Sequence, residues 1–167
     1  MKKHILYFML ISSFFSCKNE TEPKLIKKID KGNFKISVDF PDTVYINKRY
    51  NGRINYKNDL DSLTTKLLDV KKFRLIEYAF LITNNINYDV KHLKTIVKDT
   101  IYTNNNRFIP LSAISFNKLG VNYLDGIITD EVNIDTLALR EGKMQASTRI
   151  ISDDFRVTHK VIVIERK

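Results

Sequence analysis

The chain has 167 residues, of which 43% are hydrophobic and 28% are charged, and its formal net charge is +9. That length suits one domain with a single core, and the composition excludes both a wholly disordered chain and a polytopic membrane protein. A basic chain favours anionic partners, but the lysines are dispersed and no compact arginine and aromatic motif occurs. The sequence therefore predicts no nucleic-acid binding.

The first seventeen residues combine a positive start with a short apolar run that ends at a cysteine. Lys2 and Lys3 precede a run from Ile5 to Phe15, which is eleven residues long. At about 1.5 Å per residue, a helix of that length crosses only about half of a hydrocarbon core roughly 30 Å thick. A charged start followed by a short apolar segment is typical of a secretory signal peptide.

Cys17 is the single cysteine of the chain, with Ser16 before it and the polar segment 18–23 after it. This arrangement resembles the lipobox of bacterial lipoproteins, in the Phe- and Ser-rich form found in Bacteroidetes. The resemblance implies that residues 1–16 are a signal peptide that is removed, and that the Cys17 thiol carries a diacylglycerol. It also implies a cell-envelope location, at the outer membrane. Two or three acyl chains anchor a protein durably, at about 0.8 kcal/mol per buried CH₂.

Residues 17–32 are charged and poor in aromatic side chains, so they are predicted to be the lipidated N-terminus and a tether. Fully extended, such a tether reaches about 50 Å. Acidic residues just after Cys17 weakly resemble signals for export to the cell surface, which leaves the periplasmic and the surface face both open. Residues 33–167 are predicted to be the folded domain.

The body of the chain has the pattern of β-strands. Apolar and polar residues alternate over 34–40, and the pattern continues over 44–46 and 53–57. The run from Phe73 to Ile82 is nearly all apolar, as expected of a central strand covered on both faces. A helix over 60–70 is a local alternative, because Leu60, Leu63 and Leu67 are spaced for one.

Later segments are short, rich in β-branched and aromatic residues, and separated by polar clusters such as Asp125-Gly126. Apolar and polar residues alternate over 144–150, and a second predicted strand follows over 155–164. Ser152-Asp153-Asp154 between them predicts a hairpin turn. The prediction is an all-β fold: an antiparallel, immunoglobulin-like β-sandwich of about seven to nine strands.

The sequence predicts neither a metal site nor a cofactor. Beyond Cys17 the predicted mature chain offers His92, expected to be solvated, and His159, expected to lie in the interior. Carboxylates are close in sequence at Asp59 and Asp61, Asp130 and Glu131, and Asp153 and Asp154. None has the spacing of a calcium loop, and turn-forming aspartates explain them.

A tripeptide of aspartate, hydroxyl and apolar residue occurs four times, where composition gives about 0.6 matches. It resembles the O-glycosylation sequon of exported Bacteroidetes proteins, which implies glycan acceptors on exposed turns at Thr43, Ser62, Thr100 and Thr136. The same tripeptide also suits the start of a strand, since aspartate favours turns and threonine favours sheets.

Three functions remain open from the sequence. The leading hypothesis is a non-enzymatic binding or structural module, displayed on a lipid anchor, that contacts a glycan or a protein. The first alternative is an inhibitor or immunity lipoprotein that neutralises a toxin or hydrolase, for which an exposed acidic or aromatic patch is the expected feature. The second alternative is an envelope hydrolase, which requires convergent ionisable groups in a cleft.

Overall fold

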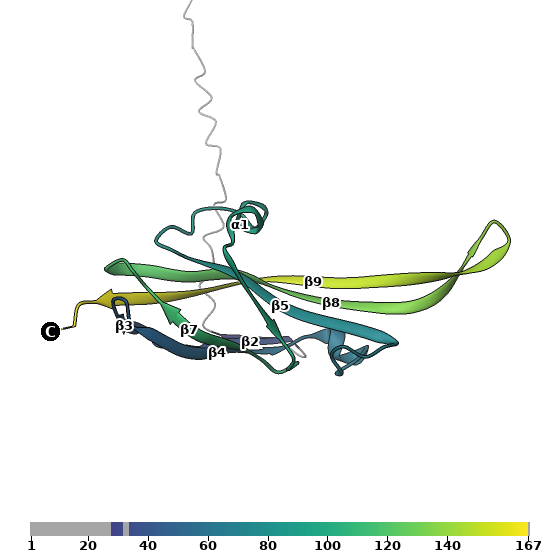
Figure 1. The fold of residues 1–167 in the computed structure, drawn as a ribbon, viewed down its shortest axis with the longest axis horizontal. Helices are drawn as coiled ribbons and strands as arrows, with labels where there is room; N and C mark the ends of the chain where they lie inside the picture. The colour runs from purple at the N-terminus through teal and green to yellow at the C-terminus, as the bar shows by residue number, and fades with distance from the viewer. Residues whose placement is uncertain (1–27, 32–33, 167) are drawn as a thin grey trace, which may run out of the picture.

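The structure is a computed structural model that describes residues 28–31 and 34–166, and within these it has two β-sheets packed face to face (Figure 1). One sheet has the order β1-β2-β4-β7, with strands Lys28–Lys31, Phe34–Asp39, Arg49–Lys57 and Phe108–Ser115. The other has the order β3-β9-β8-β5-β6, with strands Thr43–Tyr45, Lys143–Ile164, Gly120–Arg140, Lys72–Thr83 and Asp99–Thr103. The all-β prediction is confirmed.

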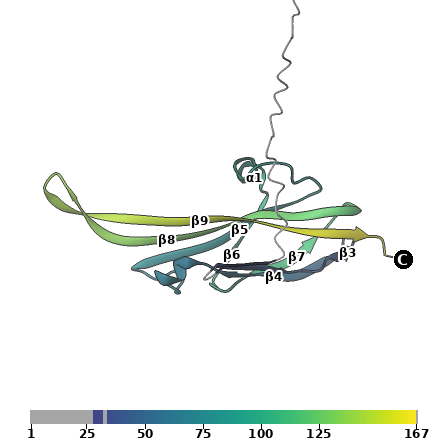
Figure 2. The same ribbon diagram turned by 180° about the vertical axis from the view of Figure 1, so that it is seen from behind.

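Neighbouring strands in both sheets are antiparallel, except that the short strand β3 runs parallel to β9. Helix α1 (Val90–Ile96) lies on the outer face of the second sheet (Figures 1 and 2). None of the helices in the described part of the chain is long and apolar enough to cross a membrane.

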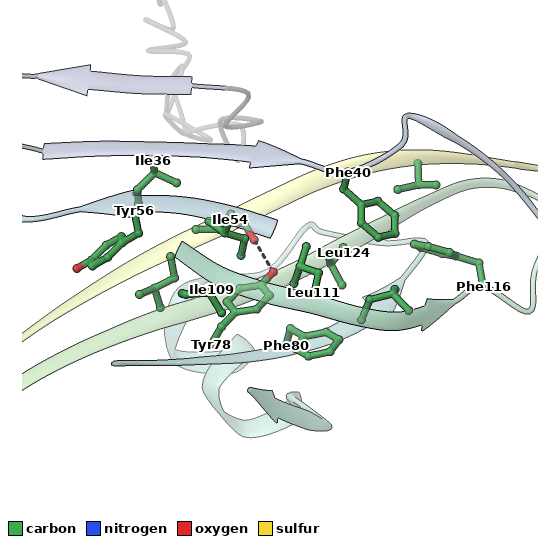
Figure 3. Close-up of a cluster of buried hydrophobic side chains, with 14 of the residues drawn as sticks. Ile36, Phe40, Ile54, Tyr56, Tyr78, Phe80, Ile109, Leu111, Phe116 and Leu124 are labelled. Carbon is green, nitrogen blue, oxygen red and sulfur yellow. Dashed lines mark hydrogen bonds between the residues drawn. The ribbon is translucent and has the colours of Figure 1, made fainter. Parts of the chain in front are cut away.

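The core lies between the sheets and follows the period-2 pattern of the sequence. Ile54, Tyr56, Ile109 and Leu111 of one sheet face Tyr78, Phe80 and Leu124 of the other (Figure 3). Phe73, at the start of strand β5, is 40% exposed, whereas the outer face near the end of the strand is also covered. There Leu81 and Ile127 pack against Leu93 of α1 and form a second, smaller core.

Gly126 lies inside strand β8, opposite Phe80, and not in a turn as its neighbour Asp125 suggested. A Cβ atom at this position would lie 2.5 Å from the Ala79 carbonyl oxygen and 2.6 Å from the Phe80 Cβ. The glycine therefore permits close packing at a central strand. The prediction that Asp125-Gly126 separates two strands is wrong.

The predicted turn at Ser152-Asp153-Asp154 is also wrong. Strands β8 and β9 pair without interruption from Gly120 opposite Val163 to Arg140 opposite Lys143, and the turn is Glu141-Gly142, with φ values of +50° and +75°. Asp153 and Asp154 stay in the strand because other elements supply partners. Asp153 accepts a hydrogen bond from Asn58, and Asp154 accepts one from Lys94.

Three other local features were left open by the sequence or differ from the prediction. Residues 60–70 contain no α-helix, only the end of the 3-10 helix η1 (Asp59–Ser62) and turns. The sequence did not predict helix α1, because it has only seven residues. Asp89 caps its N-terminus, and the side chain of Leu93 is buried. Residues 28–31 form β1 within the predicted tether, because backbone pairing with β2 needs no hydrophobic pattern.

The hairpin of β8 and β9 extends well beyond the sandwich (Figures 1 and 2). Strand β5 pairs with β8 only as far as Lys72 opposite Ile134, while β8 and β9 pair with each other on to Arg140. Residues 135–148 thus form a two-stranded projection, which we call the arm. The root of the arm is the adjoining part of the second sheet, where β5, β8 and β9 still lie side by side.

Candidate functional site

A buried ion pair lies between the sheets near the root of the arm. Arg74 of β5 and Asp130 of β8 both have fully buried side chains and make two contacts, Nε to Oδ1 at 2.8 Å and Nη2 to Oδ2 at 2.6 Å. The Tyr56 hydroxyl donates a hydrogen bond to Asp130 at 2.9 Å, and Arg74 Nη1 donates one to Asp61 at 2.8 Å. This cluster joins both sheets and η1.

The protonation states in this cluster follow from its environment. Burial alone would lower the pKa of Arg74, but hydrogen bonds and charge interactions with Asp130 and Asp61 raise it above its ordinary value. Burial, and then the negative charge of Asp130, raise the pKa of Tyr56. At neutral pH Arg74 therefore stays a guanidinium and Tyr56 a neutral phenol that donates to Asp130.

A second cluster of hydrogen bonds holds the connection between β5 and β6, which contains α1, on the outer face of the second sheet. The buried carboxylate of Asp125 accepts hydrogen bonds from Arg156 at 2.8 Å, from Thr158 at 2.6 Å and from the Tyr88 hydroxyl at 2.9 Å. Arg156 also donates to the backbone carbonyls of Ile86 and Tyr88. Burial and the hydrogen bond to Asp125 raise the pKa of Tyr88, so its hydroxyl stays a donor.

The carboxylates that are close in sequence do not form a joint site. Neighbours in one strand point to opposite faces of the sheet, so Asp130 faces the core while Glu131 faces outward, and the same holds for Asp153 and Asp154. Asp61 is paired with Arg74 and Arg107, away from the exposed Asp59. Across residues 28–31 and 34–166, no group of three or more His, Cys, Asp or Glu could hold a metal ion.

The other predicted residues are placed as follows. Cys17 lies outside the described residues. All four sequon hydroxyls are exposed, Thr43, Thr100 and Thr136 in strands and Ser62 in the 3-10 helix. His92 is exposed in α1, as predicted. His159 is buried, as predicted, and its Nε2 lies 3.6 Å from Asp42.

The arm carries large hydrophobic side chains on one face. The exposed fractions are 63% for Leu137, 68% for Leu139, 60% for Met144 and 61% for Ile150 at the root. Leu137 is opposite Ala146 and Leu139 is opposite Met144, and opposite residues share a face in an antiparallel pair. We call this side the apolar face; it continues the outer face of the sheet, on which Phe73 lies next to Asn133 and Ile150.

Polar side chains occupy the other face of the arm and its end. That face holds Thr136, Ala138, Arg140, Lys143, Gln145 and Ser147. Beyond β5, both edges of the two-stranded arm are without a neighbouring strand among the described residues. Charged residues such as Lys143 and Arg149 discourage another strand from pairing along the β9 edge. Docking through the apolar face is therefore favoured over docking through that edge.

Acidic and basic groups are separated along the arm. Glu131 and Asp135 lie on the outer side near the root, and Glu77 lies opposite Thr129, diagonal to Glu131, whereas Arg140 and Lys143 flank the turn at the tip. Within the described part of the chain, none of these five charged side chains makes an ion pair. The acidic side chains thus share the outer side with the apolar face, whereas Arg140 and Lys143 lie on the polar face of the arm.

Comparison of the chain with protein-family models, curated proteins and solved structures finds no match. The candidate site is therefore defined by geometry: a projecting hairpin with one apolar face. The sequence-based prediction did not include this hairpin, although its pattern is present in the sequence. Leu137 and Leu139 alternate on one side of Glu141-Gly142, as Met144 and Ala146 do on the other, which is the pattern of a hairpin that turns at residues 141 and 142.

Proposed function

We propose that this protein is a non-enzymatic binding module of the bacterial cell envelope, anchored by lipid on Cys17, and that the apolar face of the arm binds a partner protein. The observation that carries this proposal is the exposure, above half, of Leu137, Leu139 and Met144 on one side of a projecting hairpin. Soluble domains rarely leave adjoining large apolar side chains in water unless they dock something.

The architecture of the arm supports docking. A two-stranded ribbon without a third strand or a covering layer is marginally stable in water. The rest of the second sheet is covered on its inner face by the first sheet and partly on its outer face by α1. Among residues 28–31 and 34–166 neither covering reaches the arm, so a partner on its apolar face would supply the missing layer.

The side chains on the apolar face favour a protein over other envelope ligands. Asp135 lies within this face and Glu131 at its root, and these carboxylates would be repelled by anionic headgroups. The arm has no aromatic side chain, so it offers no ring on which a sugar could stack. A protein surface can match both the aliphatic side chains and the carboxylates.

The inhibitor or immunity hypothesis stays as the second candidate, because three carboxylates, those of Glu77, Glu131 and Asp135, lie along the outer side of β5 and β8, and an acidic surface is the feature expected of it. It differs from the leading proposal in its partner, which would be an incoming toxin or hydrolase and not a resident envelope protein. The hydrolase hypothesis has no comparable support, since Asp61 and Asp130 are engaged in ion pairs.

Site-specific photo-crosslinking in cells that make the lipidated full chain tests the proposal. A photoreactive residue replaces Leu139 on the apolar face; the matched control replaces Val70, which is 92% exposed in a loop. We expect a protein adduct from position 139 only, and its loss when Leu137→Ser is added. Absence of a protein adduct, or an adduct with lipid alone, would contradict protein docking. An adduct that appears only after an exogenous toxin is added would favour the second candidate.

A further inference from the structure

We propose that the end of the second sheet opposite the arm, where β3 lies, contacts the surface of an anionic bilayer (Figures 1 and 2). This inference rests on the lipid anchor of the proposed function, but it does not depend on what the arm binds. Three observations support it: an exposed apolar patch, cations beside that patch, and the place where the anchored chain enters the fold.

The apolar patch lies on the outer face of the second sheet, where β3 and β9 end and β8 begins. In the register, Thr43 of β3, Ile162 of β9 and Val121 of β8 form one row, and Tyr45 is opposite Ile164 in the next row. A fifth apolar side chain is in the turn before β8. We call these side chains, which are between 38% and 50% exposed, the end patch: Tyr45, Leu119, Val121, Ile162 and Ile164.

Four cations adjoin the end patch: Lys48, Lys118, Lys160 and Arg166. Lys160 lies on the same face as Ile162, two residues earlier in β9. The Nζ atom of Lys48 lies 5.9 Å from the centre of the Tyr45 ring. The other two are next to the end patch in sequence or two residues beyond it. Within residues 28–31 and 34–166, none of the four makes an ion pair.

This combination of side chains matches an anionic membrane surface. Lipid phosphates attract the four cations, while aliphatic and tyrosine side chains enter the headgroup region. The cations outnumber the carboxylates at this end, Glu165 and Asp42, and Asp42 lies 3.6 Å from the buried His159. On the arm, by contrast, the carboxylates of Glu131 and Asp135 share the outer side with the apolar face. The two apolar surfaces therefore differ in the sign of their charge.

The size of the end patch also favours a bilayer over a protein. The patch covers three adjacent strands and two rows, which is about 10 Å across the strands and about 7 Å along them. A specific protein interface takes about 800 Å² from each partner, which is more than this patch offers. At a membrane a weak contact is sufficient, because the lipid anchor keeps the domain beside the bilayer at a high effective concentration.

The anchored chain enters the fold on the side of the end patch. Strand β1 begins at Lys28, opposite Ser37, and runs back toward Phe34. The ring centre of Phe34 is 4.4 Å from that of Phe155, which is nearer to the arm. The chain from Cys17 to Lys28 spans at most about 40 Å. The anchor therefore allows the end patch to reach the bilayer while the arm is at the far end.

An environment-sensitive fluorophore on the lipidated full chain, reconstituted in vesicles, tests the contact. Thr43→Cys places the fluorophore beside Ile162 and keeps every apolar side chain of the end patch. The control, Leu139→Cys, places it on the apolar face of the arm. In vesicles of phosphatidylcholine with phosphatidylglycerol we expect a blue shift of the emission at position 43 and none at position 139. Vesicles of phosphatidylcholine alone should give a smaller shift at position 43.

Charge variants measure what the cations contribute. Lys118→Gln and Lys160→Gln should each lower the ratio of docked to undocked domains about fivefold, and about 25-fold together. The charge-matched control, Lys143→Gln with Arg149→Gln in the arm, should leave the blue shift unchanged. Raising the ionic strength from about 0.05 M to about 0.5 M should release the end patch, because the screening length falls from about 14 Å to about 4 Å.

The outcomes separate this inference from the function on which it rests. Absence of a blue shift at position 43, or a shift that the Lys118 and Lys160 variants leave unchanged, refutes the bilayer contact. A photo-adduct from position 139 to a protein then leaves docking by the arm intact. A blue shift at position 139 in place of position 43 refutes both.

Two observations on the protein in cells test the choice of partner. A photoreactive residue in place of Val121 should give an adduct with lipid, and an adduct with an acidic protein in its place refutes the membrane as the partner. A glycan on Thr43 of the native protein also refutes the contact, because Thr43 lies in one row with Ile162 and Val121 and the glycan would cover the end patch.

Discussion

Replacing Asp130 by Asn tests whether the buried ion pair holds the two sheets together at the root of the arm. The substitution keeps the shape of the side chain but leaves the buried Arg74 guanidinium without its bidentate carboxylate. Breaking a buried pair in this way costs about 3–5 kcal/mol. Because Asp61 still contacts Arg74 Nη1 at 2.8 Å, we expect the lower end of that range, about 3 kcal/mol.

Urea unfolding followed by far-ultraviolet circular dichroism measures this loss, since the chain has no tryptophan to report it. With a denaturant slope of about 2 kcal/mol per molar, the midpoint should fall by about 1.5 M. The matched control is Asp39→Asn, which breaks the exposed pair with Arg53 and should cost less than about 1 kcal/mol. A loss at Asp130 no larger than the loss at Asp39 would refute the reasoning.

A compensating variant separates charge from packing. Arg74→Met with Asp130→Leu removes both charges, and adding Tyr56→Phe removes the hydroxyl that would otherwise lose its acceptor. Since replacing a buried pair by apolar side chains is often neutral, we expect the triple variant to recover stability to within about 1 kcal/mol of the original chain. A triple variant as unstable as Asp130→Asn would show that shape, not charge, decides this region.

Three further predictions follow from single residues. Gly126→Ala forces a Cβ against the Ala79 carbonyl oxygen and should lower the free energy of unfolding by about 2 kcal/mol or more, measured by the same urea titration. Burial alone would raise the pKa of Asp154, but hydrogen bonds from Lys94 and Thr129 lower it, so this pair stabilises the fold above about pH 4 and its contribution is lost as pH falls through the lowered pKa. Lys94→Met should therefore cost a small amount, below about 1 kcal/mol, at pH 7, and less as the pH falls below about 4. Cys17→Ala should move the protein from the membrane to the soluble fraction, and unchanged retention there would refute lipidation.

The sequence by itself determined the all-β class and most of the strands. Alternation over 34–40 placed Ile36 in the core, and the apolar run at 73–82 predicted a strand covered on both faces, as β5 is around Leu81 but not at Phe73, which is 40% exposed. These features are local, because side chains two residues apart in a strand share a face whatever its partner. The sequence also predicted correctly that His159 is buried and that His92 is exposed.

Only the tertiary structure decided where the strands turn and how far they extend. Ser152-Asp153-Asp154 has turn composition, yet it stays in β9 because Asn58 and Lys94, distant in sequence, satisfy the two carboxylates. The projection of the arm depends on where β5 stops pairing with β8, a relation between segments about 60 residues apart. A pattern read along one strand carries no information on the length of its neighbour, so the apolar face of the arm became visible only once the register of three strands was known.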